Sequence, residues 1–256
     1  MNFIDHLGNT IDLSETPKRI ISLVPSQSEL LWDLGLQDEI VGITKFCIHP
    51  HEMFKCKTRV GGTKTIDIEK IRSLKPDLII GNKEENEHSQ IVELQKEFKV
   101  WMSDIYNLSD VYKTIKDIGE LVNKNNESLL LISNIKKSFS LLKKHNKSAL
   151  YLIWKNPYMA AGKATFIGDL LNEIGLNNVL ENNDLRYPEL LIEGIKQLNP
   201  DVILLSSEPF PFKEIHISEI KKHLPNKTIQ LVDGELFSWY GSRLLKSAAY
   251  FNQLVL

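Results

Sequence analysis

The chain has 256 residues, with 31 lysine and arginine residues against 33 aspartate and glutamate residues, and 42% of it is hydrophobic. This balance argues against a nucleic-acid partner, because proteins that follow a phosphate backbone carry an excess of positive charge. No apolar run is long enough to span a bilayer, and the start lacks the basic end and apolar core of a signal peptide. We therefore expect either the mature form of an exported protein or a cytosolic one.

Strands and helices alternate in the first half. The segment 3–13 predicts a small hairpin around Gly8-Asn9. A buried strand over 18–25 then leads into a helix that should begin at the capping box Ser26-Gln27-Ser28-Glu29. The next predicted elements are a strand over 39–43, a helix over 67–74, a strand over 78–82, a helix over 87–97 and a strand over 99–102. This order predicts a parallel α/β sheet, in which ligands bind at the carboxyl ends of the strands.

A long amphipathic helix is predicted in the middle of the chain, from Asn126 to His145. Its apolar residues recur in steps of three and four, which is the period of one helix face. They are Leu129, Ile132, Ile135, Phe139 and Leu142. A helix of this length would be a rod of about 30 Å, which is the size of a domain.

The second half alternates in the same way. The predicted elements are a strand over 148–154, a loop over 156–163, a helix over 165–174, a helix over 189–198, a strand over 201–206, a helix over 216–223, a strand over 228–232 and a last helix from Ser242. Strands that alternate with helices again indicate a parallel sheet.

An internal repeat relates the two halves. Residues 68–80 and 192–204 share Ile-Glu-x-Ile, a leucine three residues later, Pro-Asp and an aliphatic run. Both copies read as helix, turn and buried strand, and repeats this far apart indicate two like lobes. The sequence therefore predicts an α/β fold of two lobes, each with a central, mainly parallel sheet flanked by helices, bridged by one long helix. The predicted division is 1–125, 126–147 and 148–256.

Motifs in order along nearly the whole chain resemble the helical-backbone (class III) substrate-binding proteins of ABC importers, and among them the vitamin B12 and ferric-siderophore receptors. The matching pieces are Arg19-Ile-Ile-Ser-Leu-Val-Pro-Ser-Gln-Ser-Glu29, Val41-Gly42, Gly61-Gly62, Leu74-Lys-Pro-Asp-Leu-Ile-Ile80, Asn156-Pro-Tyr-Met-Ala-Ala-Gly-Lys163, Leu198-Asn-Pro-Asp-Val-Ile203 and Trp239-Tyr-Gly-Ser-Arg243. The resemblance implies a periplasmic or membrane-associated monomer that holds a corrinoid or an iron chelate between its lobes, without catalysis and without a cofactor of its own.

The resemblance also implies which residues touch the ligand. Matching positions and plausible neighbours are Ser26, Phe46, Thr63, Asn82, Trp154, Tyr158, Tyr187, Glu235, Trp239 and Tyr240. Thr63 and Asn82 stand where the B12 receptors carry tryptophan, which leaves the ligand open within the class. The alternative for each aromatic residue is ordinary core packing, because Trp and Tyr are largely buried in most proteins.

Docking to the membrane permease is implied for the two repeated glutamates, Glu69 and Glu193, which would pair with permease arginines. The alternative is that each acid only occupies the first turn of its helix, where the dipole favours negative charge.

Other motifs were weighed. Cys47, His49, His51 and Cys56 are zinc-type ligands, but their spacing fits no standard finger, so a surface loop with unlinked side chains is the simpler interpretation. The segment 162–165 resembles the end of a phosphate-binding loop, yet it lacks that motif's first glycine and its magnesium-binding hydroxyl. No Gly-x-Ser-x-Gly elbow is present. An enzyme is thus unsupported, and a cytosolic carrier or sensor of a corrinoid or metal cofactor remains the alternative function.

Overall fold

The computed structural model describes residues 1–180 and 185–256, and these fall into two compact units. Unit 1 comprises residues 1–104, 109–135 and 240–243, and unit 2 comprises 105–108, 136–239 and 244–256. Each unit thus receives a short segment from a part of the chain that otherwise belongs to the other. The division at 125/126 and 147/148 stays a prediction. In the part of the chain that the structure describes, no helix is both long and apolar enough to cross a membrane.

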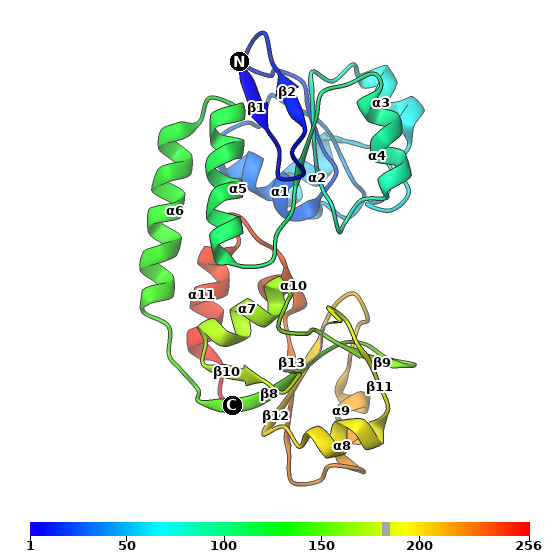
Figure 1. Ribbon diagram of the computed structural model, residues 1–256, viewed down its shortest axis with the longest axis vertical. Helices are drawn as coiled ribbons and strands as arrows, with labels where there is room; N and C mark the ends of the chain where they lie inside the picture. The colour runs from blue at the N-terminus through cyan, green and yellow to red at the C-terminus, as the bar shows by residue number, and fades with distance from the viewer. Residues whose placement is uncertain (181–184) are drawn as a thin grey trace. The chain divides into compact units, whose positions relative to one another are not determined.

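Unit 1 is built on a five-stranded sheet in the order β5-β4-β3-β6-β7, with every pair parallel. The strands are β3 (Ile20–Ser22), β4 (Ile40–Ile43), β5 (Thr58–Arg59), β6 (Leu78–Asn82) and β7 (Val100–Ser103). Helices α1 (Pro25–Asp33), α2 (His51–Cys56), α3 (Ile68–Leu74) and α4 (His88–Gln95) connect them. Figure 1 shows α3 and α4 side by side on this unit. The apolar strands and the inner faces of these helices form a common core, which includes Ile21, Ile71, Ile79 and Ile91.

The predicted hairpin at the start of the chain is confirmed. Strands β1 (Asn2–Ile4) and β2 (Thr10–Asp12) pair antiparallel, and the buried Asp5 carboxylate accepts the amides of Leu7 and Asn9 within the turn. The turn also bonds to β7, because the His6 amide donates to the Met102 carbonyl at 3.0 Å.

The long helix predicted over 126–145 is present as α6 (Asn125–Ser140), which ends five residues before His145, and another helix, α5 (Leu108–Leu121), precedes it. With 16 residues, α6 is about 24 Å long. It ends early because the amides of Lys143 and His145 bond to Asn252 and Ile174 instead of continuing the helix. Leu129, predicted on the apolar face, is 53% exposed, whereas Ile132, Ile135 and Phe139 are buried as expected.

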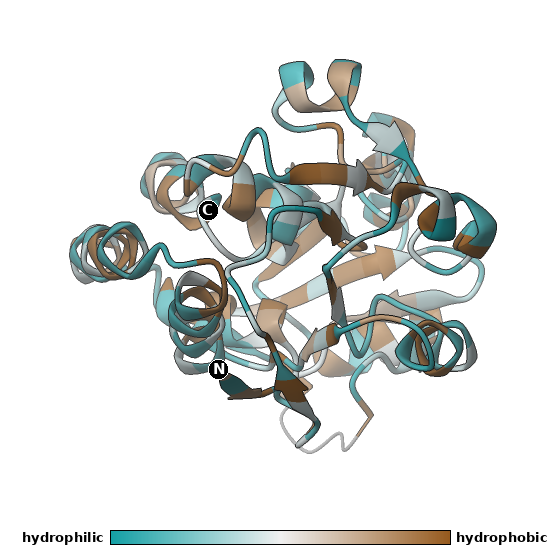
Figure 2. Ribbon diagram, turned by 90° about the horizontal axis from the view of Figure 1, so that it is seen from above, coloured by the Kyte–Doolittle hydropathy of each residue, from teal (hydrophilic) through white to brown (hydrophobic). Residues whose placement is uncertain are grey.

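Unit 2 is built on a six-stranded mixed sheet. Strands β8 (Lys147–Trp154), β10 (Leu176–Asn178), β12 (Val202–Ser206) and β13 (Thr228–Val232) are parallel. At one edge β9 (Tyr158–Ala160) pairs antiparallel with β8, and β11 (Glu189–Leu190) pairs antiparallel with β9. The helices are α7 (Phe166–Glu173), α8 (Ile192–Leu198), α9 (Glu214–Lys221), α10 (Gly234–Ser238) and α11 (Leu244–Gln253). Figure 2 shows hydrophobic colour concentrated in the strands of the protein and alternating colour on the helices. The predicted α/β class with mainly parallel sheets is confirmed.

The repeat is a repeat of structure as well as of sequence. In each unit a short helix ends in a left-handed residue, Lys75 or Asn199, and Pro-Asp then leads into a fully buried strand. The Asp77 carboxylate accepts the amides of Lys18 and Arg19, and the Asp201 carboxylate accepts the amide and the hydroxyl of Ser148. Each aspartate therefore joins the start of its own strand to the start of the neighbouring parallel strand.

The predicted capping box is wrong in detail. Helix α1 begins at Pro25, with Val24 as its N-cap and without a side-chain cap. Ser26 thus lies inside the first turn instead of capping it, and the Glu29 carboxylate, the other half of the predicted box, accepts Arg243. The box therefore does not form.

Candidate functional site

The carboxyl ends of adjacent parallel strands of unit 1 gather several of the predicted ligand residues. Asn82 is the last residue of β6, Ser103 is the last residue of β7, and Ser26 lies in the first turn of α1 after β3. Because β3, β6 and β7 are neighbours and parallel, these residues share one edge of the sheet.

A buried polar network joins them. The Gln27 amide nitrogen donates to Ser103 Oγ at 2.6 Å and to Tyr240 Oη at 3.2 Å, and Asn82 Nδ2 donates to the same Ser103 oxygen at 3.0 Å. Ser103 Oγ in turn donates to the Gly81 carbonyl at 3.2 Å. Asn82, Tyr240 and the first turn of α1 are therefore held together by two residues that the sequence did not single out, Gln27 and Ser103.

The segment that brings Tyr240 to unit 1 is anchored by an ion pair. Arg243 Nε and Nη2 donate to the two oxygens of Glu29 at 2.6 and 3.1 Å, and both side chains are almost fully buried. Tyr240 itself is 5% exposed, and burial raises the pKa of its phenol. The phenol is therefore a neutral hydrogen-bonding group at ordinary pH.

Phe46 and Thr63 lie in neighbouring loops of the same unit. Phe46 is 49% exposed, and its ring edge lies close against Gly62, where an added Cβ would be 3.2 Å from Phe46 Cε2. The side chain of Asn86 links Thr63 to Asn82, because Asn86 Nδ2 donates to the Thr63 carbonyl at 3.1 Å and its Oδ1 accepts the Asn82 amide at 2.9 Å. The five predicted ligand residues that belong to unit 1 therefore form one connected region.

Trp154 and Tyr158 lie together in unit 2, at the carboxyl end of β8. Trp154 is the last residue of β8 and pairs with Met159, the residue after Tyr158. Trp154 is 41% exposed and its ring meets Phe210 edge to face at 5.7 Å. Burial raises the pKa of the Tyr158 phenol. Phe210 comes from the loop after β12, so two strand ends of this unit together present aromatic surface.

Glu235 and Trp239 lie at the two ends of α10, beside a partly buried carboxylate, Glu208, that was not predicted from the sequence. Glu208 Oε1 accepts Trp239 Nε1 at 3.1 Å and Ser238 Oγ at 2.8 Å. Burial raises the pKa of the Glu208 carboxyl, the Ser238 bond opposes the rise, and the charge of Glu235 adds to it. Trp239 is only 8% exposed.

Tyr187 lies at the other end of β9 from Tyr158, because the Ala160 amide bonds to Pro188 while Tyr158 pairs with Leu190. The Arg186 guanidinium lies over the ring of Tyr106 at 4.5 Å and near that of Tyr187 at 5.7 Å. Within unit 2, the structure thus separates Tyr187 from the pair Trp154 and Tyr158.

The two repeated glutamates have different surroundings. Each lies in the first turn of its helix, Glu69 on α3 and Glu193 on α8, and each is exposed. Arg72 bonds to Glu69, to Glu93 of α4 and to Glu97, which follows the end of α4. The residue at the place of Arg72 in the second copy is Lys196. Arg72 therefore holds Glu69 in place, whereas the residue that matches Arg72 beside Glu193 is a lysine.

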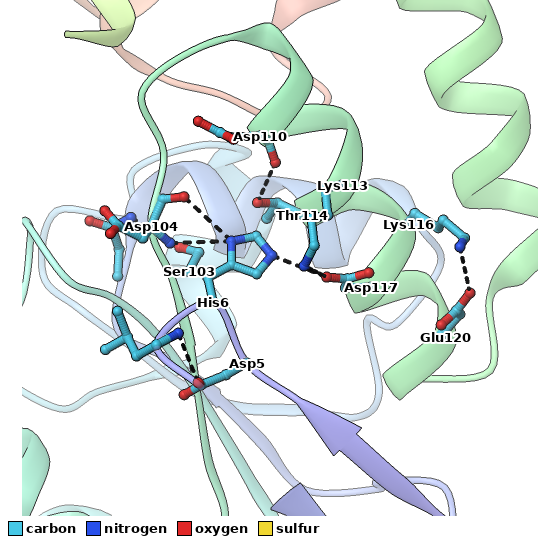
Figure 3. Close-up of polar contacts among 12 residues, drawn as sticks. Asp5, His6, Ser103, Asp104, Asp110, Lys113, Thr114, Lys116, Asp117 and Glu120 are labelled. Atoms are coloured by element: carbon cyan, nitrogen blue, oxygen red, sulfur yellow. Dashed lines mark hydrogen bonds and ion pairs between the residues drawn. The ribbon is translucent and has the colours of Figure 1, made fainter. Parts of the chain in front are cut away.

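A histidine–aspartate pair, His6 with Asp117, lies outside these regions. Figure 3 shows the His6 ring between Asp104 and Asp117, with Lys113 on the same carboxylate. The Asp104 amide donates to Nδ1 at 3.3 Å, so Nε2 carries the proton and donates to Asp117 at 3.0 Å. Ser103 is close in sequence, but its hydroxyl bonds to Gln27, Asn82 and Gly81. This arrangement fixes the hairpin to α5 and does not activate a nucleophile.

The cysteines and histidines near residue 50 are not drawn into one cluster. Both cysteines are free, Cys47 buried and Cys56 exposed, and the Cys47 thiol lies 3.1 Å from Ser28 Oγ and 3.2 Å from Thr44 Oγ1. Over residues 1–180 and 185–256, no group of three or more metal-ligand side chains is suitably placed to hold an ion.

Comparison with known proteins adds the context of a family. The family described as "Periplasmic binding protein" matches residues 20–227. An uncharacterized ABC transporter substrate-binding lipoprotein of Bacillus subtilis, YvrC, is 28% identical over 95% of this chain and 82% of its own. A vitamin B12-binding protein of Vibrio parahaemolyticus is 24% identical over 75% of this chain and 72% of its own. The crystal structure of a possible iron-binding (periplasmic solute-binding) protein of Staphylococcus epidermidis has 25% identity and a TM-score of 0.79, covering 93% of this chain and 98% of its own.

Proposed function

Since the chain belongs to the periplasmic binding protein family, matched over 20–227, we propose that it is the substrate-binding protein of an ABC importer. Its ligand is a corrinoid or an iron chelate, which it binds without chemical change and passes to the permease. It works outside the cytoplasm, in keeping with the description of its family as periplasmic and with a relative that is named a lipoprotein.

The observation that carries this proposal is the kind of surface at the strand ends. In unit 1 the exposed Phe46 lies beside a buried network of amides and hydroxyls, and in unit 2 the exposed Trp154 meets Phe210. Broad aromatic surface together with a few fixed polar groups suits a large, flat ligand with an apolar face and a polar rim.

Ligand binding is tested by titration of tryptophan fluorescence with cyanocobalamin, dicyanocobinamide and a ferric siderophore. We expect at least one of the three to quench the emission, and Tyr187→Ala to weaken that binding, because an aromatic wall is lost. Tyr112→Ala on α5 is the control and should leave the affinity unchanged. Quenching by none of the three would remove the corrinoid and chelate assignments together.

Docking through Glu69 and Glu193 is the second part of the proposal. The double variant Glu69→Ala with Glu193→Ala should bind ligand normally but fail to support uptake in cells that carry the cognate permease. The control is Glu52→Ala with Glu214→Ala, which removes one exposed first-turn acid from each unit at other helices, α2 and α9. If both double variants behave alike, the glutamates serve only their helix dipoles.

A further inference from the structure

A short apolar surface in unit 1 extends beyond the residues already assigned to the ligand. The loop after β4 exposes two large hydrophobic side chains, Phe46 at 49% and Ile48 at 44%, on either side of the fully buried Cys47. Exposed apolar side chains that are grouped rather than scattered mark interaction sites. Ile48 was not among the residues predicted from the sequence.

Hydrogen bonds fix the shape of this loop. The Cys47 amide donates to the Thr44 carbonyl at 3.2 Å, and the Ile48 amide donates to the Phe46 carbonyl at 2.9 Å. The Cys47 thiol, buried between Ser28 Oγ at 3.1 Å and Thr44 Oγ1 at 3.2 Å, ties the loop to α1. With residue 47 held inward, the side chains of residues 46 and 48 are turned outward, so their exposure follows from the fold of the loop.

The neighbouring loop supports the same surface. Gly62 lies directly against the Phe46 ring and the Lys45 side chain, so a larger residue there would push both away. The Lys45 ammonium lies 5.1 Å from the centre of the Phe46 ring. The surface therefore consists of the Phe46 ring and the Ile48 side chain, with Gly62 packed against the ring and the Lys45 ammonium at its edge.

On the basis of the proposed function, we propose that Ile48 contacts the apolar face of a flat, ring-shaped ligand together with Phe46, and that Cys47 is the residue that positions both. The occupant is the transported molecule, because the loop follows a strand at the same carboxyl edge as Asn82 and Ser103. A rigid, preformed contact of this kind adds affinity without an ordering cost on binding.

The test measures the affinity of the whole protein for cyanocobalamin and for haemin by calorimetry. Ile48→Ala should lower the affinity for the probe that binds by roughly fivefold. The reason is that the truncation removes three carbons of a side chain that is about half exposed before binding. Val92→Ala is the matched control, because Val92 is an aliphatic residue of unit 1 with a similar exposure of 41%, on α4. Equal affinities for Ile48→Ala and Val92→Ala overturn the inference while leaving the proposed function intact. Binding of neither probe to the unaltered protein also overturns the inference, because it requires a flat, ring-shaped ligand, whereas the proposed function is overturned only when the siderophore and dicyanocobinamide fail as well.

The positioning role of Cys47 is tested separately. Cys47→Ser keeps a group that bonds to Ser28 and Thr44, whereas Cys47→Ala removes it. We expect Cys47→Ala to weaken ligand binding about as much as Ile48→Ala and Cys47→Ser to restore most of the loss. A purely structural role would lower the unfolding midpoint of Cys47→Ala with no change in affinity, and that result refutes positioning.

Discussion

The ion pair between Arg243 and Glu29 offers the sharpest test of how unit 1 is held together. The two side chains are 6% and 3% exposed, and the pair has the bidentate geometry of a strong charge-assisted bond. Removal of one partner leaves a charge buried without its counter-charge, which costs about 3–5 kcal/mol. Because whole domains are stable by only about 5–15 kcal/mol, either Arg243→Leu or Glu29→Met should strongly destabilise unit 1.

The double variant Arg243→Leu with Glu29→Met should behave quite differently. Replacing both charges by apolar side chains of similar size removes the desolvation penalty, so the pair of changes should cost less than either change alone. A double-mutant cycle would then give a coupling energy of about 3 kcal/mol or more, well above the range of exposed ion pairs. The double variant must therefore be more stable than either single variant, and a loss of stability in the single variants is not enough.

Urea unfolding followed by tryptophan fluorescence is a suitable assay, because two of the four tryptophans lie in unit 1, Trp32 on α1 and Trp101 on β7. Hydrogen exchange of the α1 amides gives a second, local measure, since two units need not unfold together. Arg72→Gln, in an exposed network, is the control and should change stability far less. Single variants that lose under about 1 kcal/mol, or a double variant no better than the singles, would refute the argument.

Three further predictions concern pH and helix composition. First, burial raises the pKa of Glu208 above its ordinary 4.5, so the native state binds the proton more tightly than the unfolded chain does. Stability should therefore fall as the pH rises above 4.5. Glu208→Gln should flatten this dependence in urea melts at a series of pH values, and an unchanged slope contradicts the assignment. Second, burial alone would raise the pKa of Asp117, but bonds from His6 and Lys113 hold that pKa below 3.8. The charged carboxylate therefore stabilises the fold above that pH, and the stabilisation is lost as the pH falls through the lowered pKa. The melting temperature of His6→Ala should therefore fall less on acidification than that of the unaltered protein, whereas His88→Ala, at an exposed position, should show the unaltered dependence. Third, Gly194→Ala in α8 should stabilise by about 0.5–1 kcal/mol because an added Cβ meets nothing within 4 Å, whereas Gly119→Ala in α5 should destabilise because its Cβ would lie 2.2 Å from Ser128 Oγ; thermal melts with the same sign for both would contradict this.

The order and type of most elements could be predicted because they depend on local patterns. The buried strands at residues 78–82 and 202–206 are continuous aliphatic runs after Pro-Asp, and the copies of this motif fold alike. Patterns failed where a distant partner competed for the same groups. The box at residues 26–29 reads as a helix cap, but Arg243 takes the Glu29 carboxylate; the periodicity up to His145 reads as helix, but Asn252 and Ile174 take the amides that would continue it.

The candidate site shows the same division. Asn82 and Trp154 could be placed at strand ends, because a strand end is a local feature. Gln27 and Ser103, 76 residues apart, could not be recognised, since nothing near either residue indicates that it faces the other or Tyr240. Glu208 escaped for a similar reason: its role follows from burial beside Trp239, 31 residues later. Buried hydrogen bonds between distant segments are set by the assembled fold and leave no periodic signal in the chain.

The two units share the same strand junctions but carry different side chains at their strand ends, and this difference bears on the kind of ligand. Asp77 and Asp201 build the same junction in both units, so the frames are alike. At the strand ends they differ: unit 1 has an amide and hydroxyl network beside Phe46, and unit 2 has Trp154 with Phe210 and a largely buried carboxyl. Each of these surfaces, taken by itself, combines aromatic side chains with a few fixed polar groups, which suits contact with a large molecule whose faces and rim differ in chemistry, as those of a corrinoid or an organic iron chelate do.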